Sequence, residues 1–354
     1  MINVRNIGFG TIKPDKLEFI AEETVRRLSS HLLKAGDIVF GRKGAVERHV
    51  FIQEGNSGWF QGSDCLRLRV VDARRALPRY LSYVFLGQQH QEWMMQQCSH
   101  GATMASLNQD IIRRIPLRLP PLPTQQRIAA ILSAYDDLIE NNTRRIAILE
   151  EMARRLYEEW FVHFRFPTDA ATSVVGARLL DIADVAYGKG LPSKHLTADG
   201  DYPVYGAAKV IGRYTAFTEV ERTIIAGCRG SVGKFTITEP KCFVTNNSFT
   251  FKPKDPNDFL WFYYALADRG LEDVVSGSAQ PQITLASLSN VELSLPTADD
   301  RTRFSSIVQS WIATIWTHQR KNANLRAQRD MLLPKLISGE IDVSGAEEML
   351  EAAE

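Results

Sequence analysis

Cysteines are few in this chain of 354 residues, and long apolar runs are missing. The four cysteines form no C-x-x-C pair and no metal-ligand spacing, which fits reduced thiols better than a disulfide scaffold and argues against structural zinc. No apolar run reaches the ~18 residues that a membrane-spanning helix requires. The first ten residues, MINVRNIGFG, also lack the segments of a signal peptide. We therefore expect a cytoplasmic protein.

Complete catalytic motifs are missing as well. The glycine-rich stretch 227–235 resembles a phosphate loop, but its first glycine is displaced by one position and Phe235 stands where Ser or Thr is required. The GFG at 8–10 lacks the third glycine of a dinucleotide fingerprint. Glu239 and Lys241 have the E-x-K spacing of a nuclease metal site without the upstream aspartate, and the seven histidines form no H-E-x-x-H motif. No G-x-S-x-G elbow and no Asn-Pro-Pro-aromatic pocket occurs. We expect no catalytic site, no cofactor and no metal in this chain.

What the sequence does contain is an internal repeat. Residues 117–156 align without a gap to residues 293–332 at an offset of 176, and ten of these forty positions are identical. Each copy begins with a segment that contains proline and continues as a long heptad pattern. Such self-similarity predicts a protein built from two copies of one structural plan.

The segments before these helices also resemble each other. GDIVFGRKGAVERHVFI from Gly36 matches RTIIAGCRGSVGKFTIT from Arg222, and GWFQGSDCLRLR from Gly58 matches KCFVTNNSFTFK from Lys241. The pattern in each copy predicts two strands joined by a glycine turn and then a further strand. A helical segment follows, and after it a short helix and an edge strand that leads into the proline. The fold class is therefore mixed α+β (α/β) in each globular unit. Because only 35 residues precede Gly36, we expect the first unit to lack some opening strands that the second unit has.

The long helices carry a coiled-coil seam. Apolar or near-apolar residues alternate in steps of four and three, which is the spacing of two paired helices. We expect the two helices to pair antiparallel, with the globular units at opposite ends. Forty helical residues would make a rod about 60 Å long. The seam residues are Ile128, Leu132, Tyr135, Ile139, Asn142, Ile146, Leu149 and Leu156 in the first helix, and Phe304, Val308, Trp311, Ile315, His318, Asn322, Leu325 and Leu332 in the second.

Three of these seam positions are polar and fall near the middle of the predicted pair. Asn142, His318 and Asn322 interrupt an otherwise apolar pattern. One interpretation is that a buried amide fixes the register and orientation of the helices. The other is that all three are tolerated at the solvent edge. The sequence leaves both open.

Basic side chains near the predicted glycine turns are candidates for binding DNA. Residues 1–120 carry 17 basic and 11 acidic side chains, whereas residues 168–296 carry 12 and 14, although the whole chain has a net charge of +1. Arg and Lys at hairpin tips suit phosphate contacts and the reading of guanine edges. The alternative is ordinary solvated charge, and only the equivalence of the two copies favours DNA. The candidates are Arg42, Lys43, Arg48, Lys189, Lys194, Lys209, Arg213, Arg229 and Lys234.

The repeated segments resemble a known family. IPLRLPPLPTQQRIAAIL from Ile115, LEEMARRLYEEWFVHFRFP from Leu149 and LRAQRDMLLPKLISGEIDV from Leu325 are similar to the specificity subunit of type I restriction-modification systems. The paired hairpins GDIVFGRKG and ERTIIAGCRG resemble the matching part of that family's target recognition domains. The resemblance covers nearly the whole chain and is most specific at the helices.

This resemblance implies a domain organisation. It predicts a first target recognition domain at 1–120, shortened at its N-terminus, and a second one at 168–296. Long helices at 121–167 and 297–342 would separate the two domains, and the acidic stretch 343–354 would be a flexible tail. The family's recognition domains vary so much that no DNA-contacting residue is carried over from it.

The resemblance also implies a function. The chain would be a non-catalytic subunit that reads a bipartite, asymmetric DNA target, one half-site per recognition domain. Two modification subunits, which use S-adenosylmethionine to methylate adenine, would dock on the helices, and translocating restriction subunits would use ATP and Mg²⁺. Two alternatives stay open: a truncated, inactive specificity subunit, and a coiled-coil adaptor whose globular units bind protein.

Overall fold

The computed structural model describes residues 1–14, 16–99, 104–166, 173–229, 232–277 and 281–344. The chain divides into two compact units: unit 1, residues 1–143 and 320–354, and unit 2, residues 144–319. Each of the two long helices therefore contributes one half to each unit. Most of the tail predicted at 343–354 lies outside the described residues. In the part of the chain that is described, no helix is long and apolar enough to cross a membrane.

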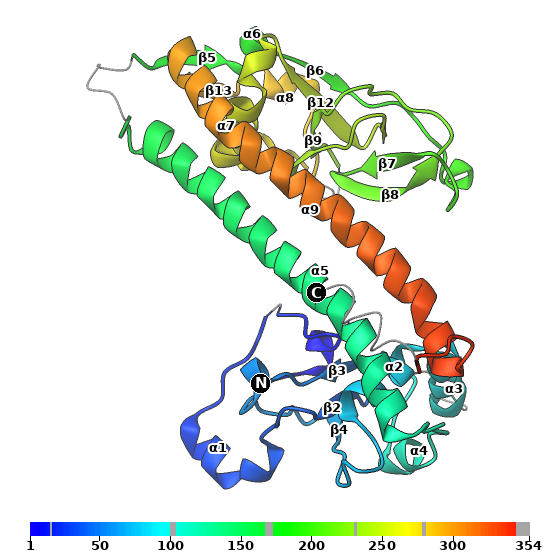
Figure 1. The fold of residues 1–354 in the computed structure, drawn as a ribbon. Coiled ribbons are helices and arrows are strands. Elements are labelled where there is room, and N and C mark those ends of the chain that lie inside the picture. Colours follow the sequence, from blue (N-terminus) through cyan, green and yellow to red (C-terminus); the bar gives the residue numbers. More distant parts are fainter. Residues whose placement is uncertain (15, 100–103, 167–172, 230–231, 278–280, 345–354) are drawn as a thin grey trace. The chain divides into compact units, whose positions relative to one another are not determined.

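The sheet of unit 1 contains the predicted strand-turn-strand. Its strand order is β1-β3-β2-β4, with β1 and β3 parallel and the other pairs antiparallel (Figure 1). Every residue of β2 is buried, as expected for a continuous apolar run in the middle of a sheet. The strands are β1 (Phe9–Gly10), β2 (Ile38–Gly41), β3 (His49–Phe51) and β4 (Cys65–Leu68).

Short helices complete unit 1 and bury one face of its sheet. The helix α2 starts with Pro78, whose missing N–H costs nothing in a first helical turn, and packs on β1 and β3. Its Tyr80 and Phe85 are fully buried in a cluster with Phe40 of β2. The helices are α1 (Glu22–Arg27), α2 (Pro78–Leu86), α3 (Gln88–Cys98) and α4 (Gln109–Arg113), with 3-10 turns η1 (Val4–Asn6), η2 (Ser29–His31) and η3 (Glu54–Asn56).

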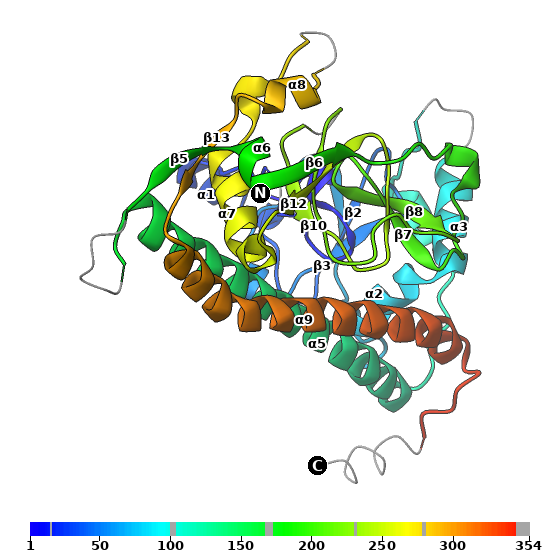
Figure 2. The ribbon, with the colours of Figure 1, turned by 90° about the horizontal axis from the view of Figure 1, so that it is seen from above.

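Unit 2 has more strands than unit 1. Its main sheet has the order β10-β9-β12-β6, and two smaller sheets have the orders β11-β7-β8 and β13-β5. Figure 2 shows β6 along the main sheet, where it pairs antiparallel with β12. The strands are β5 (Val175–Arg178), β6 (Ala183–Tyr187), β7 (Tyr202–Gly206), β8 (Lys209–Tyr214), β9 (Ile224–Gly227), β10 (Phe235–Ile237), β11 (Phe243–Val244), β12 (Ser248–Pro253) and β13 (Glu292–Leu295).

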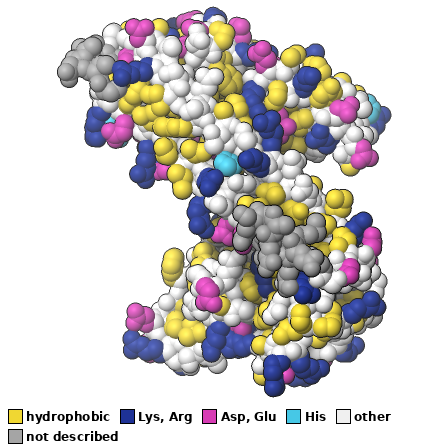
Figure 3. All heavy atoms as spheres, viewed as in Figure 1, with side chains coloured by type: hydrophobic (Ala, Val, Ile, Leu, Met, Phe, Trp, Pro, Cys, Tyr) yellow, Lys and Arg dark blue, Asp and Glu magenta, His cyan; other side chains and the backbone are white. Residues whose placement is uncertain are grey.

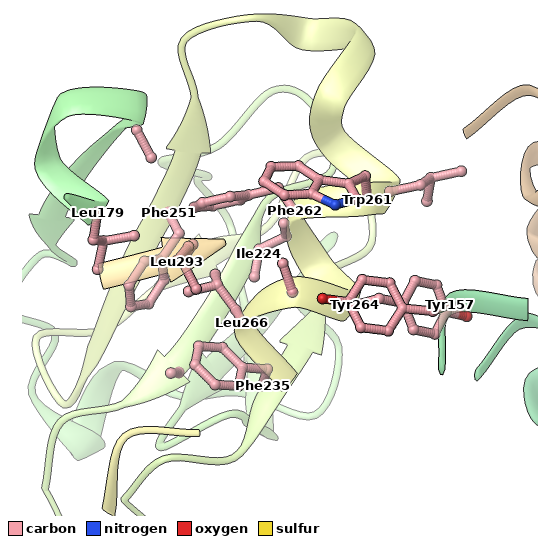
Figure 4. Close-up of a cluster of buried hydrophobic side chains, with 14 of the residues drawn as sticks. Tyr157, Leu179, Ile224, Phe235, Phe251, Trp261, Phe262, Tyr264, Leu266 and Leu293 are labelled. Atoms are coloured by element: carbon pink, nitrogen blue, oxygen red, sulfur yellow. The ribbon is translucent and has the colours of Figure 1, made fainter. Parts of the chain in front are cut away.

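The core of unit 2 lies between its main sheet and the helix α7. Ile224 and Phe251 of the sheet and Trp261, Phe262 and Leu266 of α7 belong to one cluster and are almost fully buried (Figure 4). The helices of this unit are α6 (Leu179–Ile182), α7 (Phe259–Arg269) and α8 (Leu285–Leu288), with 3-10 turns η5 (Ser193–His195), η6 (Pro256–Asp258) and η7 (Glu272–Val274).

The predicted repeat is visible in the order of elements. Strands β2, β3 and β4 of unit 1 correspond to β9, β10 and β12 of unit 2, and the helices α2 and α4 correspond to α7 and α8. The registers agree, because Gly41 pairs with Cys65 in the first copy and Gly227 pairs with Ser248 in the second. Unit 2 adds β5, β6 and the β7–β8 hairpin before this shared set.

One predicted strand is wrong. The sequence predicts an edge strand in both copies after the short helix, and only the second copy has it, as β13. In the first copy, Ile115–Pro120 lies between α4 and the long helix without forming a strand. The physical reason is the missing partner: β13 pairs with β5, and the described part of unit 1 contains no strand equivalent to β5.

The long helices begin and end near the predicted positions. The first, α5, is Leu122–Tyr157 and continues as the π-helical turn η4 (Glu158–Val162), and the second, α9, is Ala298–Ser338. Thr297 caps α9, since its Oγ1 accepts a hydrogen bond from Asp300 N at 3.3 Å. In unit 2, the first half of α9 lies beside α7 (Figure 1), and Phe304 of α9 packs on Tyr264 of α7 with ring centroids 5.7 Å apart.

Candidate nucleic-acid interface

In unit 1, the predicted basic residues flank the turn between β2 and β3. Arg42 and Lys43 directly follow β2 and are exposed. Arg48 lies one residue before β3, is half-buried and has two partners: its Nε is 3.2 Å from Glu47 Oε1, and its guanidinium lies 5.1 Å from the centre of the Phe9 ring. Arg42 and Lys43 are thus free to meet a phosphate, whereas Arg48 is already held by neighbouring side chains.

In unit 2, the equivalent residues are Arg229 and Lys234. Both are exposed, and they stand on either side of the turn between β9 and β10. Gly230 and Ser231, which lie between them, are outside the described residues. Lys209 at the start of β8 is close to this hairpin, because Thr236 of β10 donates its hydroxyl to Ala208 O at 3.1 Å.

The remaining candidates of unit 2 have different environments. Lys189 is exposed and sits beside the β11–β12 turn, where its N–H donates to Val244 O at 2.9 Å. Lys194 is exposed in η5. Arg213 is exposed on β8, but its guanidinium donates to the carbonyl oxygens of Gly200 and Asp201. Arg213 therefore holds the loop that precedes β7, a structural role that the sequence did not indicate.

A second loop meets the hairpin in each unit, and its side chains were not among the residues predicted from the sequence. In unit 1, Arg42 N donates to Asp64 O at 2.9 Å, directly before β4. In unit 2, Cys228 N donates to Asn247 O at 2.9 Å, directly before β12. A third segment also bonds to the same hairpin residue in each unit. After α3 in unit 1, Leu107 N donates to Arg42 O, and after α7 in unit 2, Ile283 N donates to Cys228 O.

Each unit therefore presents the same set of backbones at one edge of its sheet. Ser63 and Asp64 are exposed there in unit 1, and Asn246 and Asn247 are exposed there in unit 2. The only signal in the sequence was the alignment of SDC with NNS in front of the matched strands. These residues are short and polar, and they do not carry the same charge in the two copies, so they were less conspicuous in the sequence than Arg and Lys.

The chemistry available at these edges is binding rather than catalysis. Among the described residues, no cluster of three or more His, Cys, Asp or Glu could hold a metal ion. The four cysteines are free and buried, and burial raises the pKa of the Cys65 thiol to about 12, so that it is a poor nucleophile. Figure 3 shows Lys and Arg side chains dispersed among acidic ones over both units, on the face in view.

The half of the helix pair in unit 1 contains a buried polar network. Asn322 of α9 is 3% exposed, and Asn142 of α5 donates its Nδ2 to Asn322 Oδ1 at 2.9 Å. Asn322 Nδ2 in turn donates to Thr143 Oγ1 at 3.1 Å and to Ile139 O at 3.3 Å. These bonds favour the interpretation in which a buried amide sets the register over the one that places these residues at the solvent edge.

A carboxylate in the same half of the pair joins three elements of unit 1. Asp136 of α5 accepts hydrogen bonds from Arg329 of α9 at 2.6 Å, from Tyr83 of α2 at 2.7 Å and from Arg79 of α2 at 3.1 Å. Since Asn142 contacts Asn322 and Asp136 contacts Arg329, the two helices run antiparallel here. Arg329 lies between the seam residues Leu325 and Leu332, and the sequence did not indicate its partner.

None of the sixteen predicted seam residues is exposed. Seven are buried and nine are half-buried, so the seam faces protein along both helices. In unit 2, Tyr157 and Phe161 of the α5–η4 segment pack on Phe304 of α9, with ring centroids 6.0 and 5.4 Å apart. His318 is half-buried, and its Nδ1 has no hydrogen-bond partner among the described residues.

The start of each long helix is anchored by equivalent polar residues. In unit 1, Gln125 is fully buried and donates to Pro120 O at 2.8 Å and to Arg75 O at 3.0 Å. In unit 2, Arg301 donates to Pro296 O and, at 2.8 Å, to Asp258 Oδ1. Both residues lie five positions after the proline, which explains why each proline-rich segment leads into its helix at a defined place.

Comparison with known proteins identifies this arrangement. The sequence profile of the family described as "Type I restriction modification DNA specificity domain" matches residues 4–151 and 174–327. The chain is 23% identical over 359 residues to the type I restriction enzyme MjaIX specificity subunit of Methanocaldococcus jannaschii, covering 92% of this chain and 82% of the relative. It is 20% identical over 299 residues to the MjaVIII specificity subunit of the same organism, covering 74% and 70%.

A solved structure has a similar fold. The S subunit of a type I restriction-modification system from M. genitalium superposes with a TM-score of 0.60 at 19% sequence identity, over 87% of this chain and 84% of that one. The profile matches twice, once in each copy of the internal repeat. The chain therefore belongs to the family of type I restriction-modification DNA specificity proteins and carries two copies of the family's domain.

Proposed function

We propose that unit 1 and unit 2 of this non-catalytic specificity subunit each read one half of a split, asymmetric DNA target, and that the long helices set the distance between the half-sites. The observation that carries the proposal is that each sheet has an equivalent edge, at which the same backbone hydrogen bonds present different side chains in the two units. Equal backbones explain how both units can dock on the same duplex geometry. Unequal side chains explain why the two halves of the target would differ in sequence.

The exposed basic residues at this edge suit the DNA backbone. Arg42 and Lys43 in unit 1 and Lys189, Arg229 and Lys234 in unit 2 are exposed beside the loops that present the polar side chains. Phosphate contacts position a protein on a duplex, while base edges supply sequence information. Because residues 1–120 carry 17 basic and 11 acidic side chains and residues 168–296 carry 12 and 14, we expect the first of these segments to contribute more of the salt-dependent affinity.

The helices would have a second role in assembly. We propose that two modification subunits, which bind S-adenosylmethionine, dock on α5 and α9, and that restriction subunits driven by ATP and Mg²⁺ join this complex. The repeat supports this view, because two equivalent helices offer two equivalent docking faces to identical partners. None of these cofactors would bind to the specificity subunit.

The spacing role is tested by lengthening the helices. Four residues added to an α-helix increase its length by about 6 Å, which is close to two base-pair steps of ~3.4 Å. Methylome sequencing of cells that carry the inserted subunit with its modification partners should show the same two half-sites with a longer gap. Methylation at an unchanged spacing would contradict the spacing role.

The division of labour is tested by exchanging one reader. Replacing residues 168–296 by the same segment of another family member should change one methylated half-site and leave the other as it was. If both half-sites change, the two units do not read independently.

A further inference from the structure

We propose that the loop residue directly before β4 in unit 1 and directly before β12 in unit 2 selects a base in the major groove. In unit 2, Asn247 selects adenine, and in unit 1, Asp64 selects cytosine. The inference rests on the proposed reading of one half-site by each unit, and it adds the residues and the bases. The pairing of Gly227 with Ser248 and of Gly41 with Cys65 places Asn247 beside Cys228 and Asp64 beside Arg42, where the hairpin leaves the sheet.

The backbone of the unit 2 loop is fixed on several sides. Besides the bond from Cys228 N to Asn247 O, Asn246 N donates to Lys189 O at 3.1 Å and Ser248 N donates to Thr245 O at 3.0 Å. The segment with Lys189 can approach this turn because residue 188 is glycine, since a Cβ there would overlap the carbonyl oxygens of Val244 and Thr245. The backbone of the loop is therefore fixed before any ligand arrives, which reduces the backbone entropy that binding would cost.

The unit 1 loop has the same construction. Cys65 N donates to Gly62 O at 3.1 Å, which matches the turn between Thr245 and Ser248, and Gly62 N donates to Ile2 O at 2.9 Å. A Cβ at Gly62 would overlap Ile2 O and Asn3 Oδ1, so the loop is packed as closely as its counterpart. Two loops with one backbone therefore differ mainly in the side chains that they present.

Those side chains are exposed and have unused hydrogen-bonding groups. Among the described residues, none hydrogen-bonds the side chain of Asp64, Asn246 or Asn247, and none forms an ion pair with Asp64. By contrast, other short polar side chains of the fold are used internally, such as Asn108, which caps α4 through Ile111 N. Fixed loops with free polar groups, next to exposed cations, are what direct base reading requires.

The difference between the two side chains determines the bases. An asparagine amide carries an acceptor oxygen and a donor NH2 group side by side, which match adenine N6–H and N7 together. A carboxylate only accepts, so it fits the N4 amino group of cytosine and is repelled by the acceptors N7 of purines and O4 of thymine. Asn247 therefore selects adenine, and Asp64 selects cytosine.

The test is a selection from duplex DNA randomised across both half-sites, with the specificity subunit assembled with its modification subunits. Compared with the unchanged complex, Asn247→Asp should change the preferred base from adenine to cytosine at one position of one half-site, by about 5- to 150-fold. Asp64→Asn should cause the reverse change at one position of the other half-site. Asn247→Ala should lose the preference at its position without acquiring a new one.

Asn290→Asp is the matched control, because Asn290 is exposed in unit 2 in a different loop, the turn between α8 and β13. It should leave every position unchanged. If the Asn247 and Asp64 variants bind the same sequences as the unchanged complex, with or without a loss of affinity, the inference is wrong while the proposed function stands. If the unchanged complex itself shows no sequence preference, the proposed function fails first.

Discussion

Unit 1 and unit 2 share one order of strands and helices, but the side chain at one equivalent core position differs between them. His49 of β3 in unit 1 corresponds to Phe235 of β10 in unit 2, and both face the core. Phe235 packs on Phe251 with ring centroids 5.7 Å apart, whereas His49 lies 2.8 Å from Ser82 Oγ and leaves its Nδ1 without a partner among the described residues. The same fold therefore accepts an apolar or an ionisable side chain at one site, and at this site only unit 1 carries a group that acid can protonate.

The two sheets also differ at their edges. In unit 2, β6 covers the outer side of β12, but β4, the equivalent strand of unit 1, is an edge strand among the described residues. The common set is the hairpin, the third strand and the helix that packs on them. The hairpin and the third strand that present the basic and polar loops belong to this common set, and in unit 2 the segment after β6 adds a further contact, because Asn246 N donates to Lys189 O.

The largest effect that we expect from this difference is the unfolding of unit 1 in acid. Burial lowers the pKa of His49 to about 3 and that of His90 to about 4, from an ordinary 6.5. The unfolded chain therefore takes up these protons first, and stability that is complete above pH 6.5 is lost as the pH falls towards 4. Each histidine lowers the free energy of unfolding by about 1.4 kcal/mol per pH unit in this range.

Hydrogen exchange at pH 7 and pH 5 measures this effect in each unit separately. Amides of β2 and β3 should lose protection at pH 5 much more than those of β9 and β10. His49→Gln cannot be protonated and should remove about half of the loss, whereas Phe235→His should introduce a similar loss in unit 2. Equal acid sensitivity of the two units would contradict this explanation.

A smaller effect is expected at the helix seam. Asn322→Leu removes the partner of Asn142 and should destabilise unit 1 by about 1–3 kcal/mol, because a partly buried amide is left without a hydrogen bond. The double variant Asn142→Leu with Asn322→Leu should recover most of this loss, since both polar groups are then absent. Urea titration followed by fluorescence measures the three free energies.

His318, which is equivalent to Asn142 in the repeat, provides the matched control in unit 2. Its Nδ1 has no partner among the described residues, so His318→Leu should be neutral or slightly stabilising. If His318→Leu costs as much as Asn322→Leu, the seam does not distinguish paired from unpaired polar groups.

The smallest effect concerns two equivalent cations at the hairpins. Lys234 of unit 2 is exposed, whereas Arg48 of unit 1 is held by Glu47 and Phe9. If Lys234 contacts a phosphate, Lys234→Ala should reduce the slope of log affinity against log salt by about 1, and Arg48→Ala should change it less. Fluorescence anisotropy of the assembled complex at several salt concentrations measures both slopes, and a larger change for Arg48→Ala would reverse this order.

Elements that depend on neighbouring residues were predicted from the sequence more accurately than elements that depend on distant ones. The helices α5 and α9 were predicted well, since a heptad pattern depends only on neighbours three and four residues away. The strand predicted between Ile115 and Pro120 is wrong, because its partner would have to come from a distant segment. The DNA contact predicted for Arg213 rests on its charge and stays a prediction, and the charge alone did not indicate that its guanidinium donates to two backbone carbonyls.

The sequence by itself determined the repeat, the two long helices, the paired hairpins and the family, because all of these depend on local periods or on similarity between segments. Only the tertiary structure decided which polar groups are buried or presented. Gln125, Asn322 and His49 are buried because distant elements pack over them, and Asp64 and Asn247 lie beside the hairpins because antiparallel strands bring them there. Burial and register depend on the whole fold, and no local pattern encodes them.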